Sequence, residues 1–326
     1  MTRRLLAVLA LLIAWTFGGD VHAQDSGQGY PAKPVRIVVP YGAGGPGDTY
    51  TRLLAQHLAE SMKQPFVVET RPGAGALIGS DAVAKSPPDG YTLLIVSNSH
   101  TTNESLNPNR PFSLMRDFVA VAPVNYADLI LVVNPGLEAR NLRELIALAK
   151  ARPGEINYAS SGIGTVYHMS GELLRTMAGI DIVHVPHRAS GDMRNSVLGG
   201  HVQMMFDAIT TIDPMIRAGQ VRAIATTGAK RTPSTPDVPT MSESGAEGFE
   251  TNIWFGLMAP TGTPPQIVAM LDAEVHKAVT HPEIKAVWGA QGVTPWTVSR
   301  ADFEQFLRDD IAKWERVVQA TGVKLN

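Results

Sequence analysis

Five short segments of small and hydroxyl-bearing residues carry the chemistry that this sequence offers. Glycine lets the backbone approach an anion closely, and serine and threonine add hydroxyl donors. Ligands of an open α/β sheet bind beyond the carboxyl ends of its strands, where helix N-termini add partial positive charge. Taken singly, each segment is equally well explained as a tight turn; together they predict reversible carboxylate binding. The segments are residues 42–47, 73–76, 97–99, 161–165 and 189–191.

The first of these segments also matches the dinucleotide-binding pattern Gly-x-Gly-x-x-Gly, at residues 42–47. It follows an expected strand and opens an expected helix, and Glu69 ends the next strand, where a ribose-binding acid would lie. Against this alternative, Pro46 removes one backbone N–H donor from the loop. The N-terminus has the pattern of an export signal, and nicotinamide cofactors are scarce outside the cytoplasm. An NAD(P)-dependent oxidoreductase is therefore the rival hypothesis.

Histidines and acids elsewhere give weaker signals. His184 and His187 lie three residues apart on a strand and its exit, which turns them to different faces, so we expect no metal there. His168, in the first turn of an expected helix, is interpreted as a donor facing the cleft. Asp207 ends a strand and either caps the following turn or accepts from a ligand amine or hydroxyl. No Gly-x-Ser-x-Gly elbow is present, which disfavours a serine hydrolase.

Strands alternate with helices along most of the chain, which predicts a parallel sheet covered by helices on both faces. Helical periodicity begins at Asp48 and returns near residues 81–85, 141–151, 166–177 and 192–198. Two apolar helical stripes follow near the C-terminus, at residues 267–275 and 303–318. A polar loop is expected at residues 97–100. The expected strands are residues 35–39, 66–69, 91–96, 129–133, 156–159, 182–185, 202–206 and 221–226.

The N-terminus has the pattern of a cleavable secretory signal. Arg3 and Arg4 precede an apolar run over residues 5–17 that is too short to span a bilayer, and we expect cleavage after Ala23. Residues 1–23 are thus the expected signal peptide; the paired arginines leave twin-arginine export open. No later segment is apolar enough to cross a membrane. The sequence has 28 basic and 30 acidic residues, so its charge does not indicate a nucleic-acid partner. It has no cysteine, so no disulfide is expected.

Many motifs of the chain, in order, resemble the Bug-type periplasmic binding proteins of tripartite tricarboxylate transporters. The similarity begins with Pro-Val-Arg-Ile-Val-Val-Pro and the glycine-rich loop that follows it, and it includes Arg-Pro-Gly-Ala-Gly and Asp-Gly-Tyr-Thr-Leu. It covers essentially the whole chain after the signal. The matching residues are 34–48, 71–75, 89–93, 117–118, 151–162, 168, 171–173, 184–186, 198–207, 236–240 and 254–257.

This resemblance implies an α/β fold of the periplasmic binding protein type II kind, with two doubly wound lobes joined by two crossover strands. Lobe 1 would be residues 24–125 plus 254–326 and lobe 2 residues 126–253, with crossovers near residues 124–129 and 251–255. The lobes would close on a ligand carboxylate. The implied ligand-binding residues are Tyr41, Ala43, Gly44, Gly45, Asp48, Gly75, Ala76, Ser97, Ser161, Gly162, Thr165, His168 and Asp207.

Three positions depart from the family pattern at the border of the expected pocket. Thr70 stands where the family has asparagine, His187 where it has tyrosine, and Ala189 where it has glycine. Because His187 precedes Arg188, we predict a more cationic site at mildly acid pH. Unchanged ligand affinity of His187→Gln across that pH range would count against this prediction.

The function expected from the sequence is a periplasmic solute-binding protein for a small carboxylate: a dicarboxylate, an amino acid or an aromatic acid. Its partners would be that ligand and integral membrane transporter subunits; we expect a monomer, no cofactor, no metal and no enzymatic activity. A periplasmic sensor using the same closure is an alternative that sequence does not separate from transport. The mechanism expected is a population shift, in which the ligand binds the closed state better than the open one.

Overall fold

The computed structural model describes residues 29–322, and the expected signal peptide lies outside them. From Pro31 onward the described residues belong to one compact unit, which contains every described strand and helix. Within residues 29–322 we find no helix with the length and apolar character that crossing a membrane requires.

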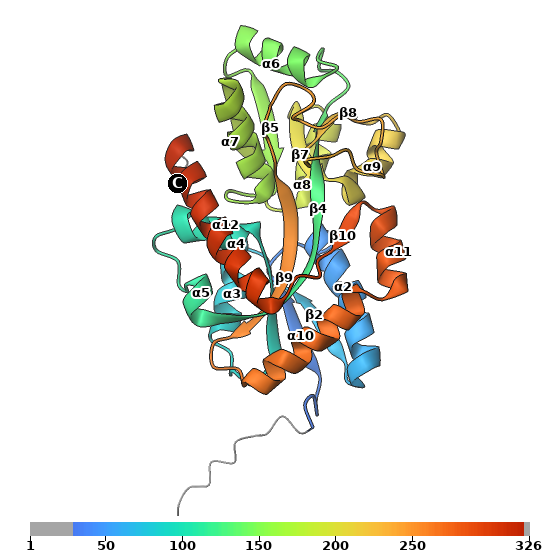
Figure 1. The fold of residues 1–326 in the computed structure, drawn as a ribbon. Coiled ribbons are helices and arrows are strands. Elements are labelled where there is room, and N and C mark those ends of the chain that lie inside the picture. Colours follow the sequence, from blue (N-terminus) through green and yellow to red (C-terminus); the bar gives the residue numbers. More distant parts are fainter. Residues whose placement is uncertain (1–28, 323–326) are drawn as a thin grey trace, which may run out of the picture. The chain divides into compact units, whose positions relative to one another are not determined.

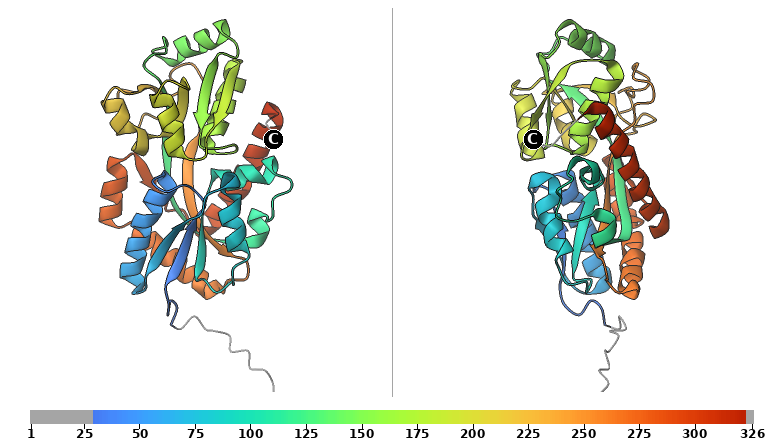
Figure 2. Two further views of the ribbon diagram at one scale, coloured as in Figure 1. Left: turned by 180° about the vertical axis from the view of Figure 1, so that it is seen from behind. Right: turned by 90° about the vertical axis from the view of Figure 1, so that its left-hand side faces the viewer.

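The first half of the unit is built on three parallel strands, β1 (Val35–Val39), β2 (Phe66–Thr70) and β3 (Thr92–Ser97), in the order β2-β1-β3. β1 and β3 are buried almost throughout because helices cover both faces (Figure 2). These helices are α2 (Pro46–Met62), the short 3-10 turn η1 (Ala74–Ala76), α3 (Leu77–Ala84), α4 (Asn98–Leu106) and α5 (Leu114–Asp117).

The second half repeats this arrangement with β5 (Ile156–Ser160) pairing in parallel with both β6 (Ile182–Pro186) and β7 (Met204–Ala208). Strand β8 (Arg222–Thr226) also belongs to this half. The helices of this half are α6 (Leu142–Ala151), α7 (Val166–Ala178), α8 (Ser190–Leu198) and α9 (Ile209–Arg217).

Two long strands join the halves, β4 (Phe118–Val133) and β9 (Asn252–Pro260), which pair antiparallel with each other (Figure 1). Strand β9 also pairs antiparallel with β3, and β4 with β7, β8 and the short β10 (Val293–Pro295). The sheet order is therefore β2-β1-β3-β9-β4-β7-β5-β6. The expected α/β fold class is confirmed. Parallel pairs form within each half, as expected, and the joining strands β4 and β9 run antiparallel to their neighbours.

The C-terminal helices α10 (Pro265–Val279), α11 (Pro282–Ala290) and α12 (Arg300–Thr321) return to the first half. Both predicted apolar stripes face the core: Leu271 and Val275 are fully buried on α10, as are Phe303 and Leu307 on α12. Trp314 of α12 packs with a buried residue of α4 in the first half and one of α7 in the second, so α12 contacts both halves.

Two expected boundaries need correction. Residues 98–100 form the first turn of α4 rather than a polar loop, because Ser97 and His100 make a capping box across the helix start. The strand expected at residues 129–133 begins at Phe118 in the structure, since β4 continues through both halves. The full length of β4 was not predicted because Pro123 and Asn125 interrupt its apolar run. The pairing of β4 with β9 shifts register near both residues.

Candidate functional site

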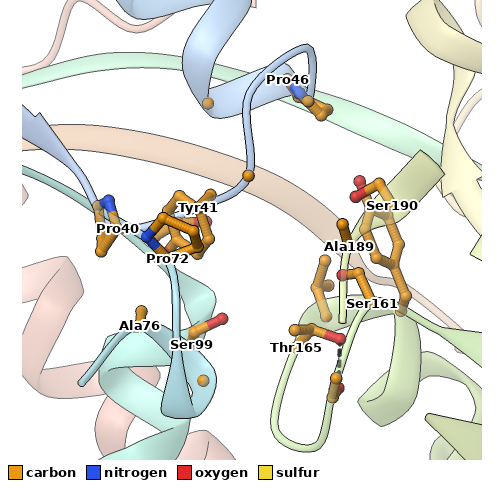
Figure 3. A pocket seen from close by; sticks show the side chains of 18 of the residues that line it. Pro40, Tyr41, Pro46, Pro72, Ala76, Ser99, Ser161, Thr165, Ala189 and Ser190 are labelled. Atoms are coloured by element: carbon orange, nitrogen blue, oxygen red, sulfur yellow. Dashed lines mark hydrogen bonds between the residues drawn. The ribbon is translucent and has the colours of Figure 1, made fainter. Parts of the chain in front are cut away.

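A cavity of about 500 Å³ lies between the two halves, beyond the carboxyl ends of β1, β3, β5 and β6. We call the lining residues within 40–47, 72–76 and 97–99 the first wall, and those within 161–167 and 187–190 the second wall. Figure 3 shows Tyr41, Pro72 and Ser99 on one side of an open space and Ser161, Thr165 and Ala189 on the other. Ile253 and Phe255 of β9 complete the lining between the walls.

Eight of the residues predicted as ligand-binding line this cavity: Tyr41, Gly45, Gly75, Ala76, Ser97, Ser161, Gly162 and Thr165. They come from both walls, so the fold brings together segments more than a hundred residues apart in the sequence. Their contacts with a ligand stay a prediction.

Five helices begin at the cavity, three from the first half and two from the second. Lining residues include Gly45 and Pro46 at the start of α2, Ala76 before α3, Ser97 before α4, Thr165 before α7, and Ala189 before α8. Gly45 and Ala189, the N-caps of α2 and α8, supply no side-chain cap, so these helix ends keep backbone N–H groups without that partner. The partial positive charge of a helix N-terminus favours an anion, and five helix N-termini lie at this one cavity.

The charge of the lining residues has one sign. No aspartate or glutamate is among the described residues that line the cavity, whereas Arg188 and His187 are. His187 Nδ1 lies 3.0 Å from the Val185 carbonyl oxygen and donates to it, which leaves Nε2 as the other polar atom of the ring. The remaining lining residues, which include Pro40, Pro72, Ala74, Val166, Ile253 and Phe255, add apolar surface. This combination suits a small anion with an apolar body.

A buried histidine supports the first wall. His100 Nδ1 accepts the Ser97 backbone N–H at 3.1 Å and faces the Tyr41 hydroxyl at 3.3 Å, while Nε2 lies 2.9 Å from Ser80 Oγ. Ser80 in turn donates to the carbonyl of Ala76. Burial lowers the pKa of His100 to about 4, so the ring is neutral and its Nδ1 is free to accept. The network fixes Tyr41 and Ala76 at the cavity.

A stacked pair of histidines, the buried His168 and the half-buried His184, supports the other wall. His168 Nδ1 accepts the Gly164 N–H at 3.1 Å, and its ring stacks on that of His184 with centroids 3.9 Å apart. His184 Nε2 lies 2.6 Å from Ser160 Oγ, which accepts the Gly162 N–H. Burial, with Arg175 adding to it, lowers the pKa of His168 to about 4. Because Ser160 is fully buried and does not line the cavity, this serine–histidine contact holds the loop rather than presenting a nucleophile.

Five residues predicted as ligand-binding do not line the cavity: Ala43, Gly44, Asp48, His168 and Asp207. The carboxylate of Asp48 accepts the Gly44 N–H at 2.9 Å and pairs with Arg52. Asp207 is fully buried, accepts the Ala208 N–H at 2.8 Å, and lies 3.1 Å from Arg194 Nε of α8. In the structure, Asp48 and Asp207 thus have protein partners that hold α2 and α8, the helices that begin at the cavity.

Several lining residues are not among the thirteen residues predicted as ligand-binding. Ala189 and Ser190 nevertheless lie in the expected binding segment 189–191, and Arg188 lies beside His187 at the expected border of the pocket, because ligands bind beyond strand ends and these residues follow β6 closely. Phe255 gave no signal in the sequence, because an aromatic residue in a buried strand normally belongs to the core. Its ring meets that of Tyr41 edge-on, with centroids 6.2 Å apart.

The dinucleotide hypothesis gains no support from the position of Glu69. Its carboxylate lies 3.2 Å from Arg36 on the neighbouring strand and does not line the cavity. Pro46 is the first residue of α2, which begins two residues before the helix start expected at Asp48.

The profile of the family described as "Tripartite tricarboxylate transporter family receptor" matches residues 50–323, and the chain belongs to this family of solute-binding receptors. The chain is 39% identical to "Protein BugT" of Bordetella pertussis (strain Tohama I) over 324 residues, 99% of this chain and 98% of the relative. It is 34% identical over 317 residues to a protein of Pseudomonas sp. (strain P51) described as "UPF0065 protein in tcbD-tcbE intergenic region", covering 97% of this chain and 93% of that one.

Solved structures agree with this assignment. "R. palustris Rpa4515 with adipate" superposes with a TM-score of 0.87 and 33% identity, over 90% of this chain and 99% of that one. "MatC (Rpa3494) from Rhodopseudomonas palustris with bound malate" gives a TM-score of 0.83 and 31% identity, over 89% of this chain and 100% of that one. The periplasmic binding protein BugD gives a TM-score of 0.85 at 31% identity, over 90% and 99%. The expected family and type of fold are confirmed.

Proposed function

We propose that this protein is a periplasmic solute-binding protein that holds a small carboxylate in the cavity between its halves and delivers it to integral membrane transporter subunits. It would bind its ligand reversibly, without chemistry. The proposal keeps the lobe boundaries expected from the sequence, with residues 24–125 and 254–326 in one lobe and 126–253 in the other. Two similar proteins whose structures hold adipate and malate support the ligand class.

The single observation that carries the proposal is the convergence of five helix N-termini on one cavity whose described lining contains no acidic side chain. Such a site stabilises negative charge through backbone N–H groups and helix dipoles, and Arg188 adds a formal positive charge. An anion that binds backbone N–H groups from both halves at once stabilises the arrangement in which the halves are close.

Two close approaches between the halves support the proposal that the halves close on the ligand. The Tyr50 hydroxyl of α2 lies 2.9 Å from Thr210 Oγ1 of α9, which belongs to the other half. A Cβ placed on Gly42 would lie 3.4 Å from the Cβ of Ala189. The Tyr50–Thr210 hydrogen bond and the close approach of Gly42 to Ala189 both lie between the halves, so a ligand that draws the walls together also favours them.

The test is calorimetric titration of the purified chain with adipate, malate, amino acids, aromatic acids and NAD(P). We expect a carboxylate to bind one per chain, and Thr165→Ala to weaken it at least tenfold, because Thr165 caps α7 at the cavity through the His168 N–H. At a hundred times its dissociation constant, a ligand stabilises the fold by about 2.7 kcal/mol, which thermal unfolding detects.

Ser299→Ala is the matched control. Ser299 caps α12 by accepting the Asp302 N–H, so this variant loses a helix cap that does not line the cavity, at a similar cost of about 1 kcal/mol. It should keep full carboxylate affinity. Stabilisation by NAD(P) and by no acid would refute the proposal and favour the oxidoreductase.

A further inference from the structure

Three potential metal ligands meet outside the cavity, where α2 packs against the C-terminal helices. His57 belongs to α2, while His281 and Glu283 stand at the start of α11 (Figure 1 shows α2, α10 and α11). None of the three lines the cavity. Ligand atoms of the three residues lie within 4.8 Å of one another.

His57 carries the inference, because its polar atom is buried and unsatisfied. The residue is 8% exposed, and no described residue hydrogen-bonds its Nε2 atom. The nearest acidic oxygen, Glu283 Oε2, lies 3.6 Å away, beyond hydrogen-bonding distance. A buried polar atom without a partner is costly, so this nitrogen points to a ligand that fills the space between the three side chains.

The other two donors are accessible and oriented by their helix. His281 and Glu283 are exposed, which leaves an entry path from solvent. As the N-cap of α11, His281 accepts the Glu283 backbone N–H at Nδ1, 3.3 Å away, and Nε2 remains the nitrogen available to an ion. The His281 ring lies beside that of His57, with centroids 4.7 Å apart. Coordination through Nε2 moves the ring proton to Nδ1 and so exchanges one long capping hydrogen bond for a metal bond.

We propose that His57, His281 and Glu283 form a binding site for a divalent transition metal ion, with Zn²⁺ as the best fit. Two imidazoles and one carboxylate are a set that zinc accepts, with a fourth position left to water. Donors around tetrahedral zinc lie about 3.4 Å apart, given zinc–ligand distances of about 2.1 Å. The His57–Glu283 separation already matches this, and a movement of about 1 Å by the exposed side chains closes the remainder.

The metal site would link α2, which starts at the first wall of the cavity, to the C-terminal helices. Helix α2 starts at the glycine-rich loop of the first wall, and more than two hundred residues separate His57 from its two partners. Tyr50 of α2 meets Trp288 of α11 edge-on, with ring centroids 5.9 Å apart, and Ser61 of α2 hydrogen-bonds Glu274 of α10. A metal ion that binds the folded chain and joins such distant segments stabilises this packing.

The experiment is calorimetric titration of the metal-free, tag-free chain with Zn²⁺ alone, in a buffer that does not chelate metals and without any carboxylate. We expect one ion per chain and a rise in the unfolding temperature. His281→Gln and Glu283→Gln should each weaken Zn²⁺ binding at least tenfold, and these exposed substitutions leave the buried core unchanged. His57→Gln should do the same, with its fold checked by circular dichroism.

His276→Gln is the matched control, since His276 is an exposed histidine on α10 outside the cluster. It should bind Zn²⁺ as the wild type does. Absence of Zn²⁺ binding by the wild type, or binding that His281→Gln and Glu283→Gln leave unchanged, would overturn the proposal. Carboxylate affinity measured on the same variants should stay constant, which separates this test from that of the cavity.

Discussion

The two walls of the cavity are each supported by a buried histidine, but they present different surfaces to a ligand. In each, a buried neutral histidine accepts a backbone N–H from the cavity loop at 3.1 Å: His100 from Ser97, and His168 from Gly164. The first wall then presents Tyr41, prolines and small residues. The second presents hydroxyls together with His187 and Arg188, the basic side chains among the described lining residues.

This difference suggests that the two walls recognise different parts of the ligand. Helix N-termini act on the ligand from both walls, so a carboxylate finds partial positive charge on either side. Formal charge comes from the second wall, while Tyr41, Pro72 and Phe255 shape the opposite surface. The first wall would therefore select the body of the ligand, and the second its charge. Four predictions test this comparison, in order of decreasing effect.

The buried neutral histidine that supports each wall predicts that the folded chain loses stability in acid. Burial holds the pKa of His100 and His168 at about 4, below the value of about 6.5 in the unfolded chain. Between these values the unfolded state binds more protons, so lowering the pH from 6.5 to 4 favours unfolding, by about 3 kcal/mol for each histidine. Asp207 acts in the opposite direction, because burial raises its pKa to about 6.

The measurement is therefore a difference between chains. Chemical unfolding of the wild type, His100→Gln and His168→Gln across this pH range should show a shallower pH dependence in each variant. His201→Gln, a change at an exposed histidine, should match the wild type. Equal slopes in all four chains would show that neither wall relies on a neutral histidine.

Closing the space between the walls should abolish binding. Ala189 of the second wall faces Gly42 of the first, and Ala189→Trp would fill the cavity with an indole ring. We expect carboxylate affinity to fall at least a hundredfold, about 2.7 kcal/mol, in calorimetry. Met177→Trp, at an exposed position on α7, is the control. A variant that still binds would place the ligand elsewhere.

Removing charge should distinguish the walls. Arg188→Gln is expected to weaken carboxylate binding about tenfold, or about 1.4 kcal/mol, since hydrogen bonds to charged groups contribute about this much. Arg71→Gln, an exposed arginine next to the first wall that does not line the cavity, should change affinity less than about threefold. Equal losses of carboxylate affinity in the two variants would contradict the idea that the second wall recognises the charge of the ligand.

The smallest effect is expected from Tyr41→Phe. The substitution removes the hydroxyl that faces His100 Nδ1 but keeps the ring against Phe255. Because Ser97 N–H still occupies His100, loss of one hydrogen bond should lower affinity about threefold, without changing selectivity among carboxylates by size. Replacement by alanine, which removes the ring as well, should alter that selectivity. If Tyr41→Ala binds long and short dicarboxylates in the wild-type ratio, the first wall does not select the ligand body.

The sequence by itself determined the alternation of strands and helices, the small polar loops at strand ends, and the family. These features are local: the Val35–Val39 strand and the apolar stripes of α10 and α12 follow from side-chain periodicity over a few residues. Eight of the thirteen predicted site residues line the cavity for the same reason, since they occupy loops that must follow strands.

Only the tertiary structure decided the rest. The family resemblance implied joining strands near residues 124–129 and 251–255, but periodicity does not record strand direction, so only the pairing shows that β4 and β9 run antiparallel. Asp207 and His168 carry groups suited to a ligand, yet each is buried behind the cavity with protein partners, and Phe255 reaches the lining from a core strand. Likewise, His57 meets His281 and Glu283 because helices distant in the sequence pack together. Which side of a loop or helix a residue presents depends on that packing, and packing is set by the whole chain rather than by neighbours in sequence.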